Sequence, residues 1–254
     1  MNSTLLYSVF HLNLAFSSIE REDYPLVVER CYYPILDLIE EGLPVAIEAT
    51  AQTLIEIERI DKGFSKRLKR LVEEGKTEFI ASGFSQVVMP LAPAVVNRWN
   101  LELGGNYYEL LLGVRPKIAL VNEQSFSAGI VDIYKESGFG AIIMDWSNSY
   151  QYNKYPKDYL FYPQSALGLD CDITVLWSHS ISFQKFQRYA HGELTLEEYK
   201  EFLFEQLSAD NDANNQRSFP LYVNDAEVFA YRPGTSTLAL KDFSETEWGR
   251  ISVL

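Results

Sequence analysis

Seven short apolar runs of strand type alternate along this chain with longer amphipathic stretches of helical period. Such alternation is typical of β-α units, in which strands pair in parallel and crossover helices cover the sheet. One uninterrupted pattern over 254 residues favours a closed or nearly closed barrel over an open sheet. The predicted strands are 5–11, 45–48, 78–82, 117–121, 141–145, 173–177 and 219–223.

The stretches between these strands complete the predicted organisation. Loops are expected at 146–163 and 178–183, and the polar segment 209–216 is expected to be mobile. We treat 1–254 as one domain in which 237–254 forms a tail, because no linker interrupts the pattern. The predicted helices are 24–41, 52–60, 64–74, 92–112, 128–137 and 196–207.

The charge of the chain argues against two classes of partner. Lysine and arginine number 22 against 35 aspartates and glutamates, which gives a net charge of -13. Proteins that bind nucleic acid or anionic membranes normally carry a basic patch. The longest basic cluster lies on a helical pattern and is interpreted as a solvated helix face. Its members are Lys66, Arg67, Lys69 and Arg70. We therefore expect neither nucleic acid nor a membrane as partner, and the oligomeric state stays open.

Cysteine and histidine usage narrows the chemistry further. Two cysteines without a CxxC motif argue against a disulfide framework, and three histidines are too few for a histidine-rich metal site. The N-terminus lacks the features of a signal peptide, and no apolar run reaches about 18 residues, so a cytoplasmic protein is expected. Aromatic residues make up 14% of the chain, and an aromatic cleft suits flat apolar ligand faces such as those of sugar rings.

Polar or aromatic residues follow every predicted strand. Parallel α/β barrels place their sites at the C-terminal ends of the strands, so these residues are expected to gather at one rim. They are His11, Asn13, Glu48, Thr50, Ser82, Ser85, Gln86, Asn122, Glu123, Asp145, Trp146, Ser178, His179, Asn224, Asp225 and Glu227.

Two carboxylates at such a rim could cleave a glycosidic bond, one as nucleophile and the other as proton donor. Glu123 and Asp225 are the best-placed pair, and by position alone Asp145, Glu48 and Glu227 compete with them. Purely structural roles for these carboxylates are alternatives to catalysis. Glu123 could be a strand-end carboxylate satisfied by backbone amides, the segment 225–227 an ordinary turn, and Asp145 the N-cap of a short turn.

Several segments resemble glycoside hydrolase family 57. The family's nucleophile glutamate after strand four is matched by residues 121–124 (VNEQ). Its helix ending in glycine is matched by residues 130–139 (IVDIYKESGF), and its strand ending in aspartate by residues 142–145 (IIMD). Residues 224–229 (NDAEVF), followed by 232–235 (RPGT), resemble its D-G-E-x-F-G segment with a downstream Pro-Gly-Thr. The segments 75–79, 89–91 and 180–183 also fall in the family's order.

The resemblance implies a seven-stranded, distorted TIM-like (β/α) barrel and a retaining enzyme that acts on α-glucans, as α-amylases and 4-α-glucanotransferases do. It implies that Glu123 is the nucleophile and Asp225 the acid/base, with no cofactor and no metal required. It also implies an oligo- or polysaccharide substrate, whose sugar would be contacted by His11, Asn13, Gln86, Asp145, Trp146 and Glu227, with Trp146 stacking on a ring.

The sequence also departs from the family pattern. The first region, usually H-x-H-x-P, carries Asn13 and Ala15 in place of its second histidine and proline. Gln86 takes the place of a histidine, and Ala226 that of a glycine. Asparagine and glutamine can still hydrogen-bond a hydroxyl but carry no charge. Family members generally continue into a helical domain, which we expect to be absent because the sequence stops at Leu254.

These departures motivate an alternative, a catalytically impaired glucan-binding relative. A second alternative is a polysaccharide deacetylase, which would need a metal held by aspartate and two histidines. His179 and His191 lie twelve positions apart, unlike the H-x3-H spacing of such sites. A third alternative is a scaffold role within an assembly, which the acidic surface permits.

Overall fold

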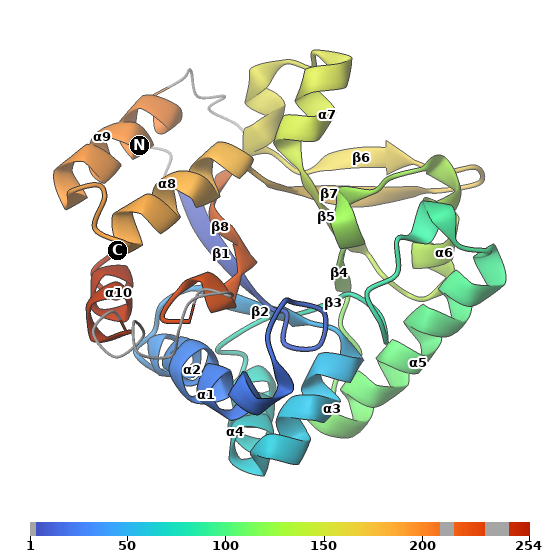
Figure 1. Cartoon of the computed structure of the whole chain (residues 1–254). Coiled ribbons are helices and arrows are strands. Elements are labelled where there is room, and N and C mark those ends of the chain that lie inside the picture. Colours follow the sequence, from blue (N-terminus) through green and yellow to red (C-terminus); the bar gives the residue numbers. More distant parts are fainter. Residues whose placement is uncertain (1–3, 209–215, 232–243) are drawn as a thin grey trace.

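The computed structural model describes residues 4–208, 216–231 and 244–254 (Figure 1). Its strands form one sheet in the order β6-β7-β5-β4-β3-β2-β1-β8. The strands are β1 (Thr4–Leu12), β2 (Val45–Ala49), β3 (Phe79–Ala81), β4 (Ile118–Leu120), β5 (Ala141–Asp145), β6 (Gln164–Leu167), β7 (Asp172–Ser178) and β8 (Arg217–Asp225).

All seven predicted strands are present, and they pair in parallel. The sheet contains one strand more than predicted, because β6 adds to β7 as an antiparallel hairpin partner. Its short sequence, Gln-Ser-Ala-Leu, carries little strand signal of its own. Among the described residues no ladder joins β7 to β8, so the barrel is incompletely closed there. The Tyr7 hydroxyl of β1 donates to the Trp177 carbonyl of β7 and links these parts of the barrel.

Side chains along each parallel strand point alternately into and out of the barrel, and they build two apolar layers. One set of residues packs together in a small cluster that contains a residue from every parallel strand. The neighbouring residues on the same strands point outward and pack under the helices in the main core. The inner cluster consists of Tyr7, Val9, Ala46, Ile80, Ile118, Leu120, Ile143, Leu176 and Val223.

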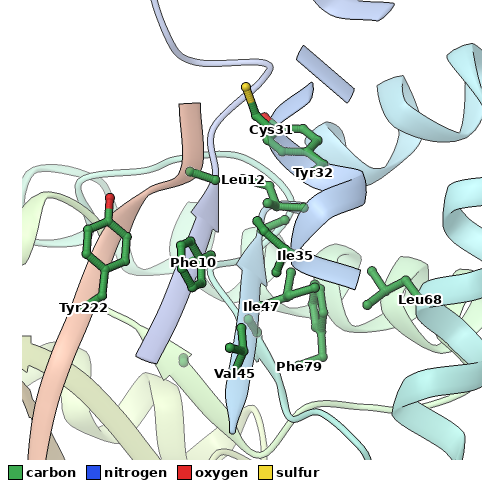
Figure 2. Close-up of a cluster of buried hydrophobic side chains, with 14 of the residues drawn as sticks. Phe10, Leu12, Cys31, Tyr32, Ile35, Val45, Ile47, Leu68, Phe79 and Tyr222 are labelled. Carbon is green, nitrogen blue, oxygen red and sulfur yellow. The ribbon is translucent and has the colours of Figure 1, made fainter. Parts of the chain in front are cut away.

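Helices cover the outer face of the barrel, as the alternation predicts (Figure 1). The predicted helix at 24–41 is present as a continuous helical run with a π-helical turn at Val28–Tyr32. Figure 2 shows part of the core beneath it, where Ile35 and Leu68 face Ile47 and Phe79 of the sheet. The helices are α1 (Tyr24–Val27), α2 (Tyr33–Glu40), α3 (Ala51–Ile60), α4 (Lys62–Glu73), α5 (Ala94–Leu112), α6 (Ala128–Glu136), α7 (Trp146–Asn153), α8 (Ser180–Ala190), α9 (Leu196–Leu207) and α10 (Ser244–Ile251).

Two predicted loops are wrong in part. The segment 146–163 contains α7 and the 3-10 helix Lys157–Phe161, and residues from 180 onward form α8. The helical pattern of both segments is weak, and buried aromatic residues stabilise the helices instead. These residues are Trp146 and Phe161 in the segment 146–163 and Phe186 in α8.

The segment 237–254, for which the sequence suggests a tail, is described from residue 244 onward. Residues 237–243 lie outside the described part of the chain, but 244–251 form α10, which packs against α8. The Trp248 indole is buried and donates to the Arg30 carbonyl at 2.9 Å. The predicted mobile segment 209–216 lies outside the described residues except for Gln216.

The basic cluster lies on α4, as predicted, and its arginines face acidic residues of α2. Arg67 binds Asp37 and Glu40, and Arg70 also contacts Glu40. Both cysteines are free thiols. Within the described residues, no helix is both long and apolar enough to cross a membrane.

Candidate active site

A cavity of about 250 Å³ opens at the C-terminal ends of β1, β4 and β8. We call it the mouth cavity. The apolar inner cluster forms its floor through Val9, Leu120 and Val223. Its polar lining consists of His11, Asn13, Gln86, Asn122, Glu123, Gln124, Asn224 and Asp225. Glu123 and Asp225, 102 positions apart in the sequence, therefore line the same space.

A tight turn after β4 presents Glu123 to the cavity. Glu123 and the next residue, Gln124, both adopt the left-handed backbone region, with φ of 53° and 52°. This region costs a non-glycine residue roughly 1–2 kcal/mol, so such residues persist only where their surroundings hold them, often at functional sites.

Side chains on both flanks of the turn hold it in place. The buried Asn122 amide donates to the Ser82 carbonyl at 3.0 Å, which anchors the turn to the end of β3. The Gln124 side-chain oxygen accepts the backbone N–H of Asp145 at 2.6 Å, which anchors it to the end of β5. The strained turn is thus fixed between its two neighbouring strands.

Asp225 ends β8, and its carboxylate remains 40% exposed, open to the cavity. The Tyr222 hydroxyl donates to the Asp225 backbone carbonyl at 2.5 Å, and the Asp225 N–H donates to the Asn224 side chain at 2.9 Å. These contacts fix the backbone while leaving the carboxylate available for a ligand.

Strand register places His11 between two carboxylates. In the sheet, His11 lies beside Glu48 of β2 on one side and Asp225 of β8 on the other. Its Nδ1 is hydrogen-bonded to Oε2 of the fully buried Glu48, and its Nε2 lies 3.9 Å from Oδ1 of Asp225. Burial lowers the pKa of His11, an effect that the nearby charge of Asp225 opposes.

Glu227 occupies a buried position behind the cavity. The Tyr32 hydroxyl and the Asn13 backbone N–H, the latter at 2.7 Å, both donate to its Oε1. Burial and the charge of Asp225 raise the pKa of Glu227 to about 8. A protonated Glu227 thus ties the segment after β1, which carries Asn13, to the segment after β8.

The structure brings together five of the eight site residues predicted from the sequence: His11, Asn13, Gln86, Glu123 and Asp225. The side chains of the other three, Asp145, Trp146 and Glu227, are not in the lining of the mouth cavity.

Each of these three has a structural partner instead. Asp145 is the N-cap of α7, accepting the Asn148 N–H at 2.9 Å, and its other oxygen accepts the Ser180 hydroxyl. The predicted N-cap role of Asp145 is thereby confirmed, although the element that it caps is the helix α7 rather than a short turn. Trp146 is buried and stacks on Tyr150 rather than facing the cavity. Glu227 is only 1% exposed, for the reasons given above.

The predicted site omitted four residues that shape the mouth cavity. Glu48 follows a predicted strand and was a competing carboxylate, but only the register with β1 shows that it holds His11. Asn122 was expected at the rim but without a role, and Gln124 directly follows Glu123 in sequence, which is a signal that could have found it. Tyr32 lies on a helical stretch and has no sequence signal connecting it with Glu227. Among the described residues, no group of three or more His, Cys, Asp or Glu is arranged to hold a metal ion.

Comparisons with solved structures show the same fold in carbohydrate-active proteins. The 4-α-glucanotransferase from Thermococcus litoralis is 17% identical with a TM-score of 0.73, over 98% of this chain and 35% of that one. The α-amylase AmyC from Thermotoga maritima is 13% identical with a TM-score of 0.64, over 90% and 68%. A protein from Mycobacterium smegmatis described as a putative polysaccharide deacetylase is 12% identical with a TM-score of 0.61, over 99% and 83%.

The chain thus spans about a third of the length of the glucanotransferase. A comparison with curated protein sequences gave no match. The sequence model of glycosyl hydrolase family 57, in contrast, matches residues 8–248, which is nearly the whole chain. The match includes residues of every parallel strand and all the residues of the mouth cavity, and we conclude that the chain belongs to glycosyl hydrolase family 57.

Proposed function

We propose that this protein is a retaining glycoside hydrolase or transglycosidase that acts on α-glucans, with Glu123 as nucleophile and Asp225 as acid/base. One observation carries the proposal. Two carboxylates from distant parts of the sequence line one small cavity at the C-terminal mouth of the barrel. Membership of glycosyl hydrolase family 57 supports the same assignment.

In the first step, the Glu123 carboxylate attacks the anomeric carbon and forms a glycosyl ester. The bond between that carbon and the glycosidic oxygen breaks, and Asp225, which must be protonated in the substrate complex, donates its proton to the departing oxygen. The two anchors of the turn prevent the nucleophile from moving away from the reacting carbon.

In the second step, Asp225 accepts a proton from a water molecule or a sugar hydroxyl as that oxygen attacks the anomeric carbon. The ester bond to Glu123 breaks, and the carboxylate is restored with net retention of configuration. Hydrolysis and transfer differ only in the acceptor. A retaining reaction needs the two carboxyl groups about 5–5.5 Å apart when substrate is bound.

His11 is proposed to bind a sugar hydroxyl next to the reacting carbon. Its Nε2 is buried, has no hydrogen-bond partner among the described residues, and points toward Asp225. The side-chain oxygens of Asn13 and Asn122 are likewise buried without a partner. Buried polar atoms are nearly always hydrogen-bonded, so these three atoms are suited to the hydroxyls of a bound sugar.

The test is incubation with maltooligosaccharides, followed by chromatography of the products. We expect shortened or redistributed chains with the wild type and none with Glu123→Gln, whose side chain is isosteric but cannot form the ester. Glu22→Gln, which changes an exposed carboxylate elsewhere, is the matched control. Proton NMR of the first product is expected to show the α-anomer.

The alternative function, glucan binding without catalysis, predicts a different result. It is motivated by Asn13 and Gln86, which line the mouth cavity with amides where family members carry histidines. Binding of maltooligosaccharides by the wild type without any product, under conditions in which a family 57 amylase is active, would replace the proposed enzyme with this alternative.

A further inference from the structure

A second, larger cavity of about 840 Å³ adjoins the mouth cavity. We call it the tyrosine cavity. It is lined by the outward-facing residues Val175 and Trp177 of β7 together with residues of α7 and β6. Gln124 lines both cavities, so the residue that follows the proposed nucleophile separates the two spaces. A chain-like ligand that leaves the mouth cavity on this side would enter the tyrosine cavity.

Aromatic faces are exposed around this cavity. Tyr152 on α7 is 81% exposed, and Tyr155 and Tyr159 are 40% and 39% exposed. The rings of Tyr155 and Tyr159 are stacked, with centroids 6.3 Å apart and planes inclined by 20°. Phe126 adds a further half-exposed ring. Exposed aromatic rings that gather in one place mark a binding surface rather than a core.

The lining chemistry specifies a neutral ligand. None of the sixteen described lining residues is charged, in a chain whose net charge is -13. Amide and hydroxyl groups from Asn148, Asn153, Gln164 and the serines alternate with the aromatic rings. Such a set can hydrogen-bond hydroxyls and cover apolar ring faces, but it offers no cation for a phosphate or a uronate.

A buried donor supports the same conclusion. Trp177 is 7% exposed and lines the cavity, and its indole Nε1 is buried without a hydrogen-bond partner among the described residues. An indole N–H is a donor only, and a buried one usually finds an acceptor. A hydroxyl oxygen of a bound ligand would supply it.

We propose that the tyrosine cavity binds further units of the same α-glucan chain whose reacting bond lies in the mouth cavity. This inference rests on the proposed function for the identity of the glucan. The stacked pair formed by Tyr155 and Tyr159, together with Tyr152, then determines how strongly the protein prefers long chains over short ones.

Calorimetric titration of the Glu123→Gln protein with maltotriose and maltoheptaose tests the binding without turnover. In that background, Tyr152→Ala and Tyr159→Ala are each expected to weaken maltoheptaose binding roughly five- to tenfold and to change maltotriose binding less. Tyr152→Phe keeps the ring and is expected to restore binding. Trp99→Ala, which removes a 61% exposed ring from α5 outside both cavities, is the matched control.

The outcomes separate this inference from the proposed function. Tyrosine-dependent binding of long chains by a wild type that forms no product supports the cavity and overturns the enzyme. Turnover by the wild type, combined with Tyr152→Ala and Tyr159→Ala proteins that in the Glu123→Gln background bind both substrates like the Trp99→Ala control, overturns the cavity alone. The absence of both binding and turnover overturns both.

Discussion

Glu227→Gln is expected to make this protein more stable at alkaline pH relative to the wild type. The wild-type carboxyl is buried, and its pKa in the folded state is raised to about 8 from an ordinary value of 4.5. Glutamine resembles the protonated acid, and its side-chain oxygen can still accept from Tyr32 and from the Asn13 N–H. The variant therefore keeps both hydrogen bonds but can never become a buried anion.

The sign and size of this difference in stability follow from proton linkage. Because the folded-state pKa lies above the unfolded one, protonated Glu227 contributes stability that is complete below pH 4.5 and is lost as the pH rises through 8. One pKa unit corresponds to about 1.4 kcal/mol, so the loss between pH 5 and pH 8 is roughly 3 kcal/mol. The second cause of the shift is the charge of Asp225, so Asp225→Asn is expected to reduce the loss.

Urea unfolding at pH 5, 6, 7 and 8 measures this difference. The free energy of unfolding of the wild type minus that of Glu227→Gln is expected to fall steadily across the series by roughly 3 kcal/mol. Subtracting the variant removes contributions from groups that titrate equally in both proteins, and the exposed Glu22→Gln serves as control. A difference that stays constant from pH 5 to pH 8 would refute the buried, protonated state of Glu227.

Three further predictions address positioning and packing. Glu48→Gln is expected to lower kcat on maltooligosaccharides roughly ten- to hundredfold and to change KM less. The reason is that His11 loses a charge-assisted hydrogen bond that orients it. Equal effects on kcat and KM would contradict this positioning role of Glu48. Gly104→Ala is expected to destabilise the fold by about 1–3 kcal/mol in urea unfolding, because its Cβ would lie 2.5 Å from a backbone carbon. Gly129→Ala has open space around it and is expected to stabilise α6 by about 0.5–1 kcal/mol. Asp145→Ala is expected to cost about 1 kcal/mol of stability through the lost N-cap and to leave KM unchanged, and a raised KM with unaltered stability would restore the sugar-binding role.

The sequence predicted the barrel well because its signal is local and repeated. Each parallel strand is a short apolar run bounded by turn residues, and a helix such as 196–207, which is the whole of α9, has an amphipathic period. Where helices are short and polar, as in α7, the local preference is weak and buried aromatic contacts decide the structure. Those contacts join residues far apart in the chain and leave no periodic pattern.

The aromatic residues also show the division between what the sequence indicates and what tertiary packing decides. The sequence suggested a cleft for sugar rings, yet many of these rings fill the core, including the fully buried Tyr32, Tyr108 and Tyr134. Others line the tyrosine cavity, as the half-exposed Tyr155 and Tyr159 do. Composition counts rings but does not say which side of a helix or strand they face.

The sequence by itself determined the parallel strands, the end of the barrel at which polar residues gather, and the candidate carboxylates Glu123 and Asp225, because strand polarity places all C-terminal ends at one rim. Only the tertiary structure decided which rim residues share a cavity. Strand register set His11 between Glu48 and Asp225, burial removed Glu227 from the lining, and a helix cap engaged Asp145. Register and burial depend on how whole layers pack, and no residue's immediate sequence neighbours specify them.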